Sequence, residues 1–300
     1  MERLNILKLS TSVMSIKNMT GESGMYVNKV QIAGDYVLVS NYTARGFGAP
    51  HHKRRQKLKD TPKAMADYNR KMRAEKLQLL IIQNFDCGYH ITLDYPKDAR
   101  PETYEEAEKN LKKFLYAMSR KVKKIKPFKY IAITERGKRR EALHHHMIIE
   151  GDPFLLREIT RLWGNHIKIS QMYEEGAYKE LAEYFTKIET KEEQIKGRSK
   201  YHRSRNLKEP EVKTRIVAGG IPSEPLVPNQ YDLIRDSEIS GFNEHIGIRF
   251  QKYMVKKKPK PPEKPKKPDF GFKEKQKSDQ KRSARCTIWE SLKKIFKRRD

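Results

Sequence analysis

The sequence has few cysteines and tryptophans and no long apolar run. Its 300 residues include 2 cysteines and 2 tryptophans. Cys87 and Cys286 stand far apart, which argues against a disulfide framework and favours a reducing compartment, the cytoplasm. No apolar segment approaches the length that crosses a bilayer, and residues 1–17 lack the apolar core of a signal peptide. We therefore expect a cytoplasmic protein without stable membrane insertion.

Acidic residues are also in deficit. The chain has 65 Lys and Arg against 38 Asp and Glu, which gives a formal net charge of +27. Such an excess favours a polyanionic partner, most often nucleic acid, with an anionic membrane surface as the alternative. The length allows one good core and a second small unit.

The C-terminal part carries much of the positive charge. Residues 256–285 are rich in Lys and Pro, so charge repulsion and missing backbone donors predict a basic linker within a disordered tail. Residues 286–300 repeat apolar side chains at helical spacing against a basic face. This amphipathic helix could dock on the main domain or bind a membrane surface, a partner or DNA. The structure of residues 216–255 is left open.

Near the N-terminus, residues 27–43 indicate a β-hairpin around an Ala-Gly-Asp turn, within an extension that covers residues 1–60. The next segment begins with Thr61 and Pro62, which suit the N-cap and the first position of a helix. This helix leads into the main domain, expected over residues 61–215.

The main domain shows the clearest order of elements. Apolar alternation predicts strands, and 3.6-residue periodicity with caps predicts helices, in the order β-α-β-β-α-β-α. The strands cover 88–94, 129–135, 143–150 and 166–172, and the helices 101–124, 152–164 and 175–191. The first six elements match the split βαβ, ferredoxin-like pattern, an α+β fold with an antiparallel sheet and helices on one face.

Three consecutive histidines open the third strand of this domain. Because alternate residues of a strand share a face, His144 and His146 point one way and His145 the other. Pairing with the preceding strand around the 136–142 turn puts Glu135 opposite His144, with Cβ atoms about 5 Å apart. Two imidazoles and a carboxylate then form a three-ligand cation site. A polar strand end that contacts DNA phosphates is the alternative, and Glu150 is a weaker ligand candidate.

The last helix carries a tyrosine and a lysine on adjacent turns, Tyr184 and Lys187. Tyr178 lies six positions before Tyr184, so the two tyrosines point apart. A phenol is a poor nucleophile at neutral pH because its pKa is near 10. A cation that polarises a phosphate and a lysine that neutralises developing charge would overcome this. Alone, a helical tyrosine is more often a packing residue; with the histidines it indicates phosphoryl transfer.

Three segments in order, HITLDYP, ITERGKRREALHHHMII and AYKELAEYFTK, resemble the motifs of HUH endonucleases. The chain most resembles rolling-circle replication initiators, in the branch of replication-associated proteins that includes filamentous-phage gene II-type proteins. The resemblance covers about residues 69–213, including the basic stretch after the tyrosine helix. Each motif alone is weak; the three in this order on the expected elements are specific.

The resemblance implies a role for each matching residue. His144 and His146 would be the HUH pair and Glu135 the third ligand of Mg²⁺ or Mn²⁺, with zinc less suited to the reaction. Tyr184 would attack a phosphodiester of single-stranded origin DNA and become linked to the 5′ phosphate, and Lys187 would assist. Relatives with two tyrosines carry the second one turn earlier, where this chain has Glu180 and Leu181, so a single-tyrosine scheme is implied.

DNA binding is expected from basic and aromatic residues around the site. They are Lys138, Arg139, Arg140, Arg198, Lys200, Tyr201, Arg203, Arg205 and Lys208. A free 3′ hydroxyl would serve a host polymerase, with a host helicase as a further partner. Two other functions remain open: a single-tyrosine transposase or relaxase of the same superfamily, and a nucleic-acid-binding module without chemistry.

Overall fold

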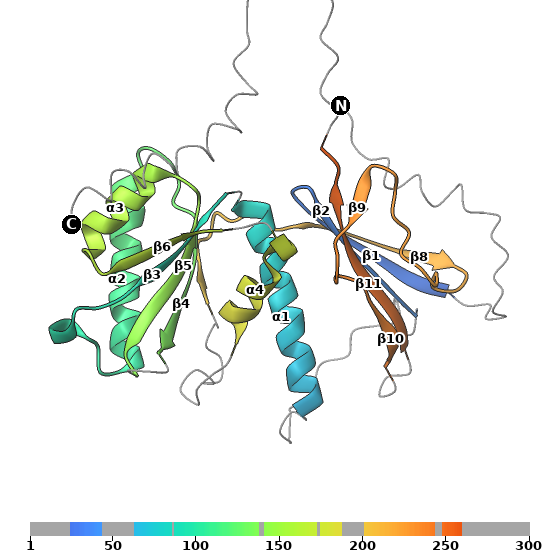
Figure 1. The fold of residues 1–300 in the computed structure, drawn as a ribbon, viewed down its shortest axis with the longest axis horizontal. Coiled ribbons are helices and arrows are strands. Elements are labelled where there is room, and N and C mark those ends of the chain that lie inside the picture. Colours follow the sequence, from blue (N-terminus) through green and yellow to red (C-terminus); the bar gives the residue numbers. More distant parts are fainter. Residues whose placement is uncertain are drawn as a thin grey trace, which may run out of the picture. The chain divides into compact units, whose positions relative to one another are not determined.

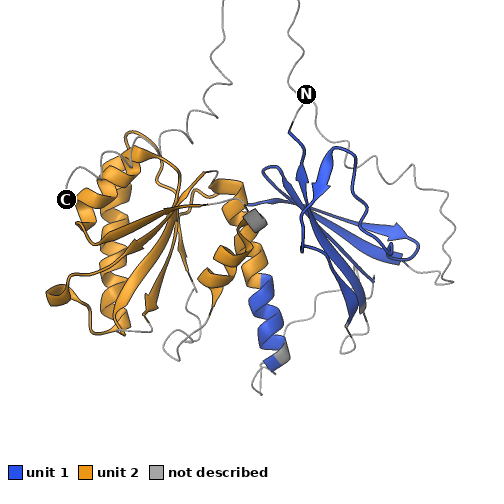
Figure 2. Ribbon diagram, in the orientation of Figure 1, with its two compact units in different colours: residues 1–72, 209–260 blue, residues 73–208, 261–300 orange. Residues whose placement is uncertain are grey.

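A computed structural model describes residues 25–43, 63–85, 87–137, 141–172, 175–187, 201–243 and 248–259. Over these ranges the chain is a mixed α+β protein with two antiparallel sheets and four α-helices (Figure 1). It divides into two compact units, residues 1–72 with 209–260 and residues 73–208 with 261–300 (Figure 2). The second unit is therefore inserted in the sequence of the first. Of the expected linker, residues 256–285, only residues 256–259 are described, and Lys256 and Lys257 end a strand there. Residues 260–300, with the helix expected over 286–300, lie outside the described residues.

The first unit contains a six-stranded sheet. β1 (Met25–Ala33) and β2 (Tyr36–Thr43) form an antiparallel hairpin, and Gly34 takes a positive φ in its turn. The remaining strands are β8 (Glu211–Ala218), β9 (Tyr231–Leu233), β10 (Ile239–Asn243) and β11 (Ile248–Lys257). β8 begins inside the domain predicted over residues 61–215, and the others come mostly from residues 216–255, whose structure was left open. The order is β10-β11-β2-β1-β8, with β9 paired to β11.

The second unit contains a five-stranded sheet. It is built from β3 (Tyr89–Leu93), β4 (Tyr130–Arg136), β5 (Leu143–Ile149), β6 (Ile167–Gln171) and the short β7 (His202–Arg203). The strand order is β6-β3-β5-β4-β7, and all neighbours are antiparallel. Without β7 this is the arrangement of the split βαβ pattern.

The helices of the second unit begin where local sequence signals place them. In α2 (Tyr104–Val122) the Thr103 hydroxyl accepts a hydrogen bond from the Glu106 backbone N–H. In α3 (Pro153–Trp163) the Asp152 side chain accepts one from Phe154, and proline occupies the first turn. Both caps satisfy donors that have no partner inside the helix.

The core of this unit lies between the sheet and helices α2 and α3. It contains buried residues of β3, β4, β5, α2 and α3, among them Ile91, Met147, Leu111, Met118 and Ile159. Since alternate strand residues point to opposite faces, the other face of the sheet carries His90, His144 and His146. α4 (Lys179–Thr186) lies over that other face, where the Phe185 ring is 5.8 Å from the ring of His90.

α1 (Lys63–Asn84) connects the two units in sequence, and its last turns belong to the second unit. There the Gln78 side chain donates a hydrogen bond to the backbone oxygen of Ala177, just before α4. Among the described helices, including α1, none combines the length and apolar character needed to span a membrane.

Candidate metal and tyrosine site

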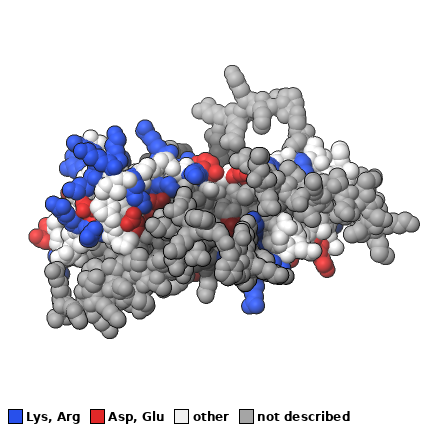
Figure 3. Space-filling model, turned by 90° about the horizontal axis from the view of Figure 1, so that it is seen from above, with Lys and Arg blue, Asp and Glu red and all other residues white. Residues whose placement is uncertain are grey.

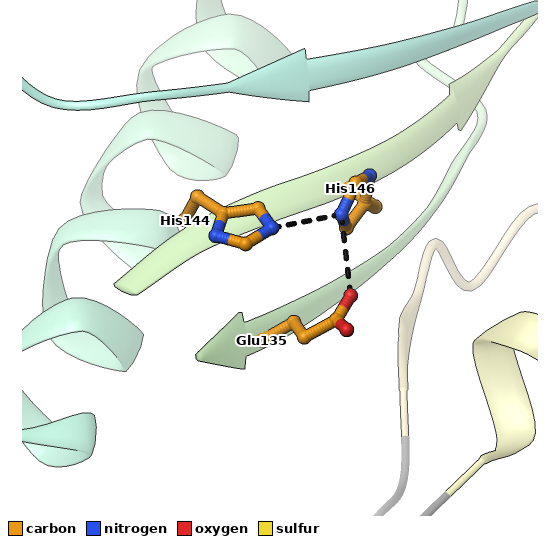
Figure 4. Close-up of side chains that lie close together, drawn as sticks. All are labelled: Glu135, His144 and His146. Atoms are coloured by element: carbon orange, nitrogen blue, oxygen red, sulfur yellow. Dashed lines mark hydrogen bonds and ion pairs between the residues drawn. The ribbon is translucent and has the colours of Figure 1, made fainter. Parts of the chain in front are cut away.

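The β4–β5 hairpin sets the positions of the three ligand candidates. Glu135 lies directly opposite His144, which is the register that the sequence analysis assumed. His146 is two residues further along β5 and therefore shares a face with His144. Figure 4 shows the three side chains, from the two neighbouring strands, turned toward one point.

The distances within this triad suit a divalent ion. Nε2 of His144 lies 3.0 Å from Nε2 of His146, which is 3.3 Å from Oε2 of Glu135. All three ligand atoms lie within 4.8 Å of one another. Adjacent ligands of an octahedral ion bound at about 2.1 Å are about 3 Å apart. The described residues therefore include a triad that could hold a metal ion and leave positions for substrate oxygens.

The carboxyl of Glu135 is ionised in this setting. Burial opposes ionisation, but hydrogen bonds from His146 and Tyr184 and the charges of the two imidazoles outweigh it. Together they lower the pKa of Glu135 to about 2. The side chain is therefore an anionic ligand at neutral pH.

Tyr184 reaches the triad from α4. Its hydroxyl donates a hydrogen bond to Oε2 of Glu135 and lies 2.7 Å from Nε2 of His146. The Tyr184 ring stands edge-on to the His146 ring, with centroids 5.1 Å apart. A phenol oxygen and three candidate metal ligands thus meet at one place, although Tyr184 is 38 residues from His146.

Tyr178 stands at the N-cap of α4, before Tyr184 in the chain. Tyr178 is buried and takes a left-handed backbone conformation at the N-cap of α4, as does Ala177 before it. α4 ends at Thr186, and Lys187 follows with an extended backbone. The sequence predicted that Lys187 continues the helical face of Tyr184. It does not, because the backbone is already extended at Lys187, whose N–H donates to the backbone oxygen of Tyr184 and closes the last turn. Its catalytic role stays a prediction.

His145 points through the sheet to the α2 side. Its Nε2 lies 2.6 Å from the Tyr95 hydroxyl, and its Nδ1 lies 3.0 Å from Oγ1 of Thr134. Thr134 in turn donates to the buried carboxylate of Glu108, which lies 2.6 Å from His202 on β7. Burial lowers the pKa of His145 to about 3. This histidine belongs to a polar network beneath the triad and is not a ligand candidate.

Two site residues were missed in the sequence. His90 and Thr92 on β3 each place a polar atom 3.2 Å from Nδ1 of His146. Burial lowers the pKa of His90, and the charge of the neighbouring His146 lowers it further, to about 4. The alternation in YHITL gives both residues one face, but only the pairing of β3 with β5 shows that this face is the site. That pairing is not written in local sequence.

The predicted DNA-binding residues fall into two groups. Lys138, Arg139, Arg140, Arg198 and Lys200 lie outside the described residues. The other four lie around β7, at the β4 edge of the sheet: Tyr201 precedes the strand, Arg203 belongs to it, and Arg205 and Lys208 follow it. Arg203 pairs with Ile131 and so shares the sheet face of Glu135; Arg203, Arg205 and Lys208 are exposed and Tyr201 is half-buried.

Glu150, the weaker ligand candidate, is engaged by lysines. Its carboxylate oxygens lie 2.9 Å from Lys126 and 3.0 Å from Lys129. Hydrogen bonds and charges from Glu150 and Asp152 raise the pKa of Lys126 against the opposing effect of burial. This cluster ties the end of β5 to the segment before β4 and takes no part in the triad.

Comparison with known proteins gives one match. The sequence model of a family of replication-associated proteins, described by its ORF2 and gene II protein members, matches residues 88–189. The matched segment runs from just before β3 to just after α4 and so contains the triad and Tyr184. No curated protein and no solved structure matches the chain. The resemblance to replication-associated proteins that the motifs indicated is therefore confirmed, over residues 88–189, for this family.

Proposed function

We propose that this protein initiates rolling-circle replication of a phage or plasmid as an HUH-type endonuclease and strand transferase. The family match supports a replication initiator. The observation that carries the chemical part is the position of the Tyr184 hydroxyl on both Glu135 and His146. A nucleophile and a candidate metal triad at one point suit attack on a phosphodiester.

The reaction is a transesterification. The phenol oxygen of Tyr184 bonds to the phosphorus, the bond from phosphorus to the 3′ oxygen breaks, and the phenol proton ends on the departing 3′ hydroxyl. Glu135 accepts the hydrogen bond of Tyr184 and orients its oxygen. Bound Mg²⁺ or Mn²⁺ would polarise the phosphate oxygens. The phosphotyrosyl bond conserves energy for later rejoining. The free 3′ hydroxyl serves a host polymerase, and a host helicase is a further partner.

Charge supports DNA as the partner. The net charge is +27, and Lys and Arg side chains gather over the unit that contains α2 and α3, on the left of Figure 3. A positive field of this kind raises the association rate with a polyanion. Near the site, Arg203 and Arg205 are exposed beside β4 and suit contacts to the backbone of a single strand.

The test is formation of a covalent protein–DNA adduct. Purified protein and Mn²⁺ are mixed with single-stranded fragments that tile the replicon encoding it, and adducts are resolved on denaturing gels. We expect the protein to become covalently linked to the DNA product that begins with the 5′ phosphate. Tyr184→Phe loses it because the nucleophile is absent, and His146→Ala loses it because the triad is broken. Tyr178→Phe is the matched control and keeps most of the adduct.

Two results would contradict the proposal. One is an adduct that persists in Tyr184→Phe and disappears in Tyr178→Phe, which would move the nucleophile. The other is tight binding of the same fragments by the wild type without any adduct in Mn²⁺ or Mg²⁺, which would indicate a binding module without chemistry.

A further inference from the structure

β3 supplies the residues that hold the second histidine of the triad. Thr92 lies directly opposite His146 in the β3–β5 ladder, and His90 is two positions away on the same face. Nε2 of His90 and Oγ1 of Thr92 each lie 3.2 Å from Nδ1 of His146. The rings of His90 and His146 are stacked, with centroids 5.2 Å apart and planes inclined by 27°.

The two nitrogens of His146 face different surroundings. Nε2 faces Glu135, His144 and the Tyr184 hydroxyl, the point where an ion would bind. A nitrogen that binds a metal needs its lone pair, so a neutral imidazole that binds through Nε2 carries its proton on Nδ1. That N–H needs an acceptor, and His90 and Thr92 are the side chains within hydrogen-bond distance.

His144 is held in the same sense by a backbone group. Its Nδ1 lies 3.2 Å from the backbone oxygen of Ala142, and a carbonyl can only accept. The proton of His144 is therefore on Nδ1, which leaves Nε2 free for an ion. Both triad histidines are thus held as the tautomer that is protonated on Nδ1. The hairpin backbone holds His144, and β3 holds His146.

We propose that Thr92 and His90 are positioning residues of the metal centre, which hold His146 as the tautomer with an unprotonated Nε2 and fix its ring toward the triad. The hydroxyl oxygen of Thr92 accepts a hydrogen bond from the Nδ1–H of His146. His90 adds a second acceptor and a stacked ring, itself placed edge-on to Phe185 of α4 at 5.8 Å. This inference rests on the proposed function, because it concerns the ion that this function requires.

The test measures Mn²⁺ affinity of the full-length protein by electron paramagnetic resonance. Thr92→Val keeps the shape of the side chain and removes the acceptor, and His90→Phe keeps the ring and removes both nitrogens. We expect each variant to lose about 10- to 100-fold in Mn²⁺ affinity. Thr92→Ser keeps the hydroxyl and is expected to restore it. Ser170→Ala is the matched control, because Ser170 is an exposed β6 residue paired with His90 and outside the triad.

Unchanged Mn²⁺ affinity in folded Thr92→Val and His90→Phe would overturn the positioning role. A second measurement needs no substitution: ¹H–¹⁵N correlation of the imidazoles in the Mg²⁺-loaded wild type, because without an ion Nε2 of His146 donates to Glu135. A protonated Nδ1 at both His144 and His146 supports the inference, and a protonated Nε2 at His146 overturns it. If the variants keep their Mn²⁺ affinity or His146 is protonated on Nε2, but the wild type still forms the Tyr184 adduct, the positioning role fails and the proposed function stands. A wild type without Mn²⁺ binding would overturn both.

Discussion

The three adjacent histidines of β5 differ because strand geometry divides them between two environments. His144 and His146 meet Glu135 on the face under α4, whereas His145 is buried against Tyr95 and Thr134. One sequence motif therefore supplies both the candidate ligands and a structural group beneath them.

His145 makes the free energy of unfolding depend on pH. Its pKa is about 3 in the folded chain against an ordinary 6.5. Below pH 6.5 the unfolded chain takes up a proton that the folded chain refuses until about pH 3, so stability falls as pH decreases through this window. The slope for one such group is about 1.4 kcal/mol per pH unit. His145→Gln should reduce the slope, while His90, whose pKa is about 4, maintains part of it.

Urea unfolding between about pH 5 and pH 7.5, in EDTA to exclude metal, measures this slope. Trp163 is a local reporter, since its ring centroid is 5.5 Å from that of His145, and Trp289→Phe removes the other tryptophan. His166→Gln is the control because His166 is exposed. A slope that is the same in His145→Gln and in the wild type would show that His145 is not the group responsible.

At the scale of elements, the approach of β3 to the end of β5 depends on a glycine. A Cβ built on Gly151 would lie 2.0 Å from the backbone oxygen of Cys87, two residues before β3. Backbone cannot move aside as a flexible side chain can. The close approach fixes the start of β3 beside the β5–α3 turn, and hence the register that brings His90 and Thr92 to His146.

Gly151→Ala should therefore lower the free energy of unfolding by about 2 kcal/mol or more. Gly220→Ala is the matched control, because a Cβ there meets nothing within 4 Å, and its effect should stay within about 0.5 kcal/mol. Differential scanning calorimetry measures the unfolding transitions of both units in each variant. Equal transition temperatures for the two variants would mean that the chain near Cys87 adjusts without cost.

The sequence predicted those elements whose signals are local. The Asp152 cap, the helical periodicity and the alternation in β3, β4, β5 and β6 placed the six elements of the split βαβ pattern within a few residues. The hairpin register followed because Glu135 and His144 are close in sequence. The end of α4 at Thr186 was not predicted, because helical periodicity continues through Lys187 and no proline or glycine marks the stop.

What depends on distant pairing was missed. Four strands between Glu211 and Lys257 form a sheet by pairing with β1, β2 and each other. Some of their partners lie 210 residues away or more, as in the buried hydrogen bond between Asn41 and Gln251. His90 and Thr92 escaped notice for the same reason, since their function depends on a neighbouring strand more than 50 residues away.

For the whole molecule, electrostatics should govern DNA affinity. The affinity for a short single strand spanning the nick site is expected to fall steeply with NaCl, because each neutralised phosphate releases counterions. Replacing Arg203 and Arg205 by alanine should reduce the slope of log K against log salt by about 1 for each phosphate that the variant no longer neutralises.

Fluorescence anisotropy with a labelled oligonucleotide measures this slope. The control replaces Lys112 and Lys113, which are exposed on α2, the helix that covers the sheet face opposite to Tyr184. Equal reductions of slope in the two double variants would place the strand elsewhere or make binding a property of net charge alone.

The insertion of the second unit into the first has a consequence for synthesis. A ribosome completes residues 73–208, with the histidines and Tyr184, before any of β8 to β11 has been translated. Until then β1 and β2 are an isolated two-stranded hairpin, which is only marginally stable in water. A nonsense mutation shortly after residue 208 would thus release a chain that contains the whole candidate site, while its other sheet lacks four of six strands.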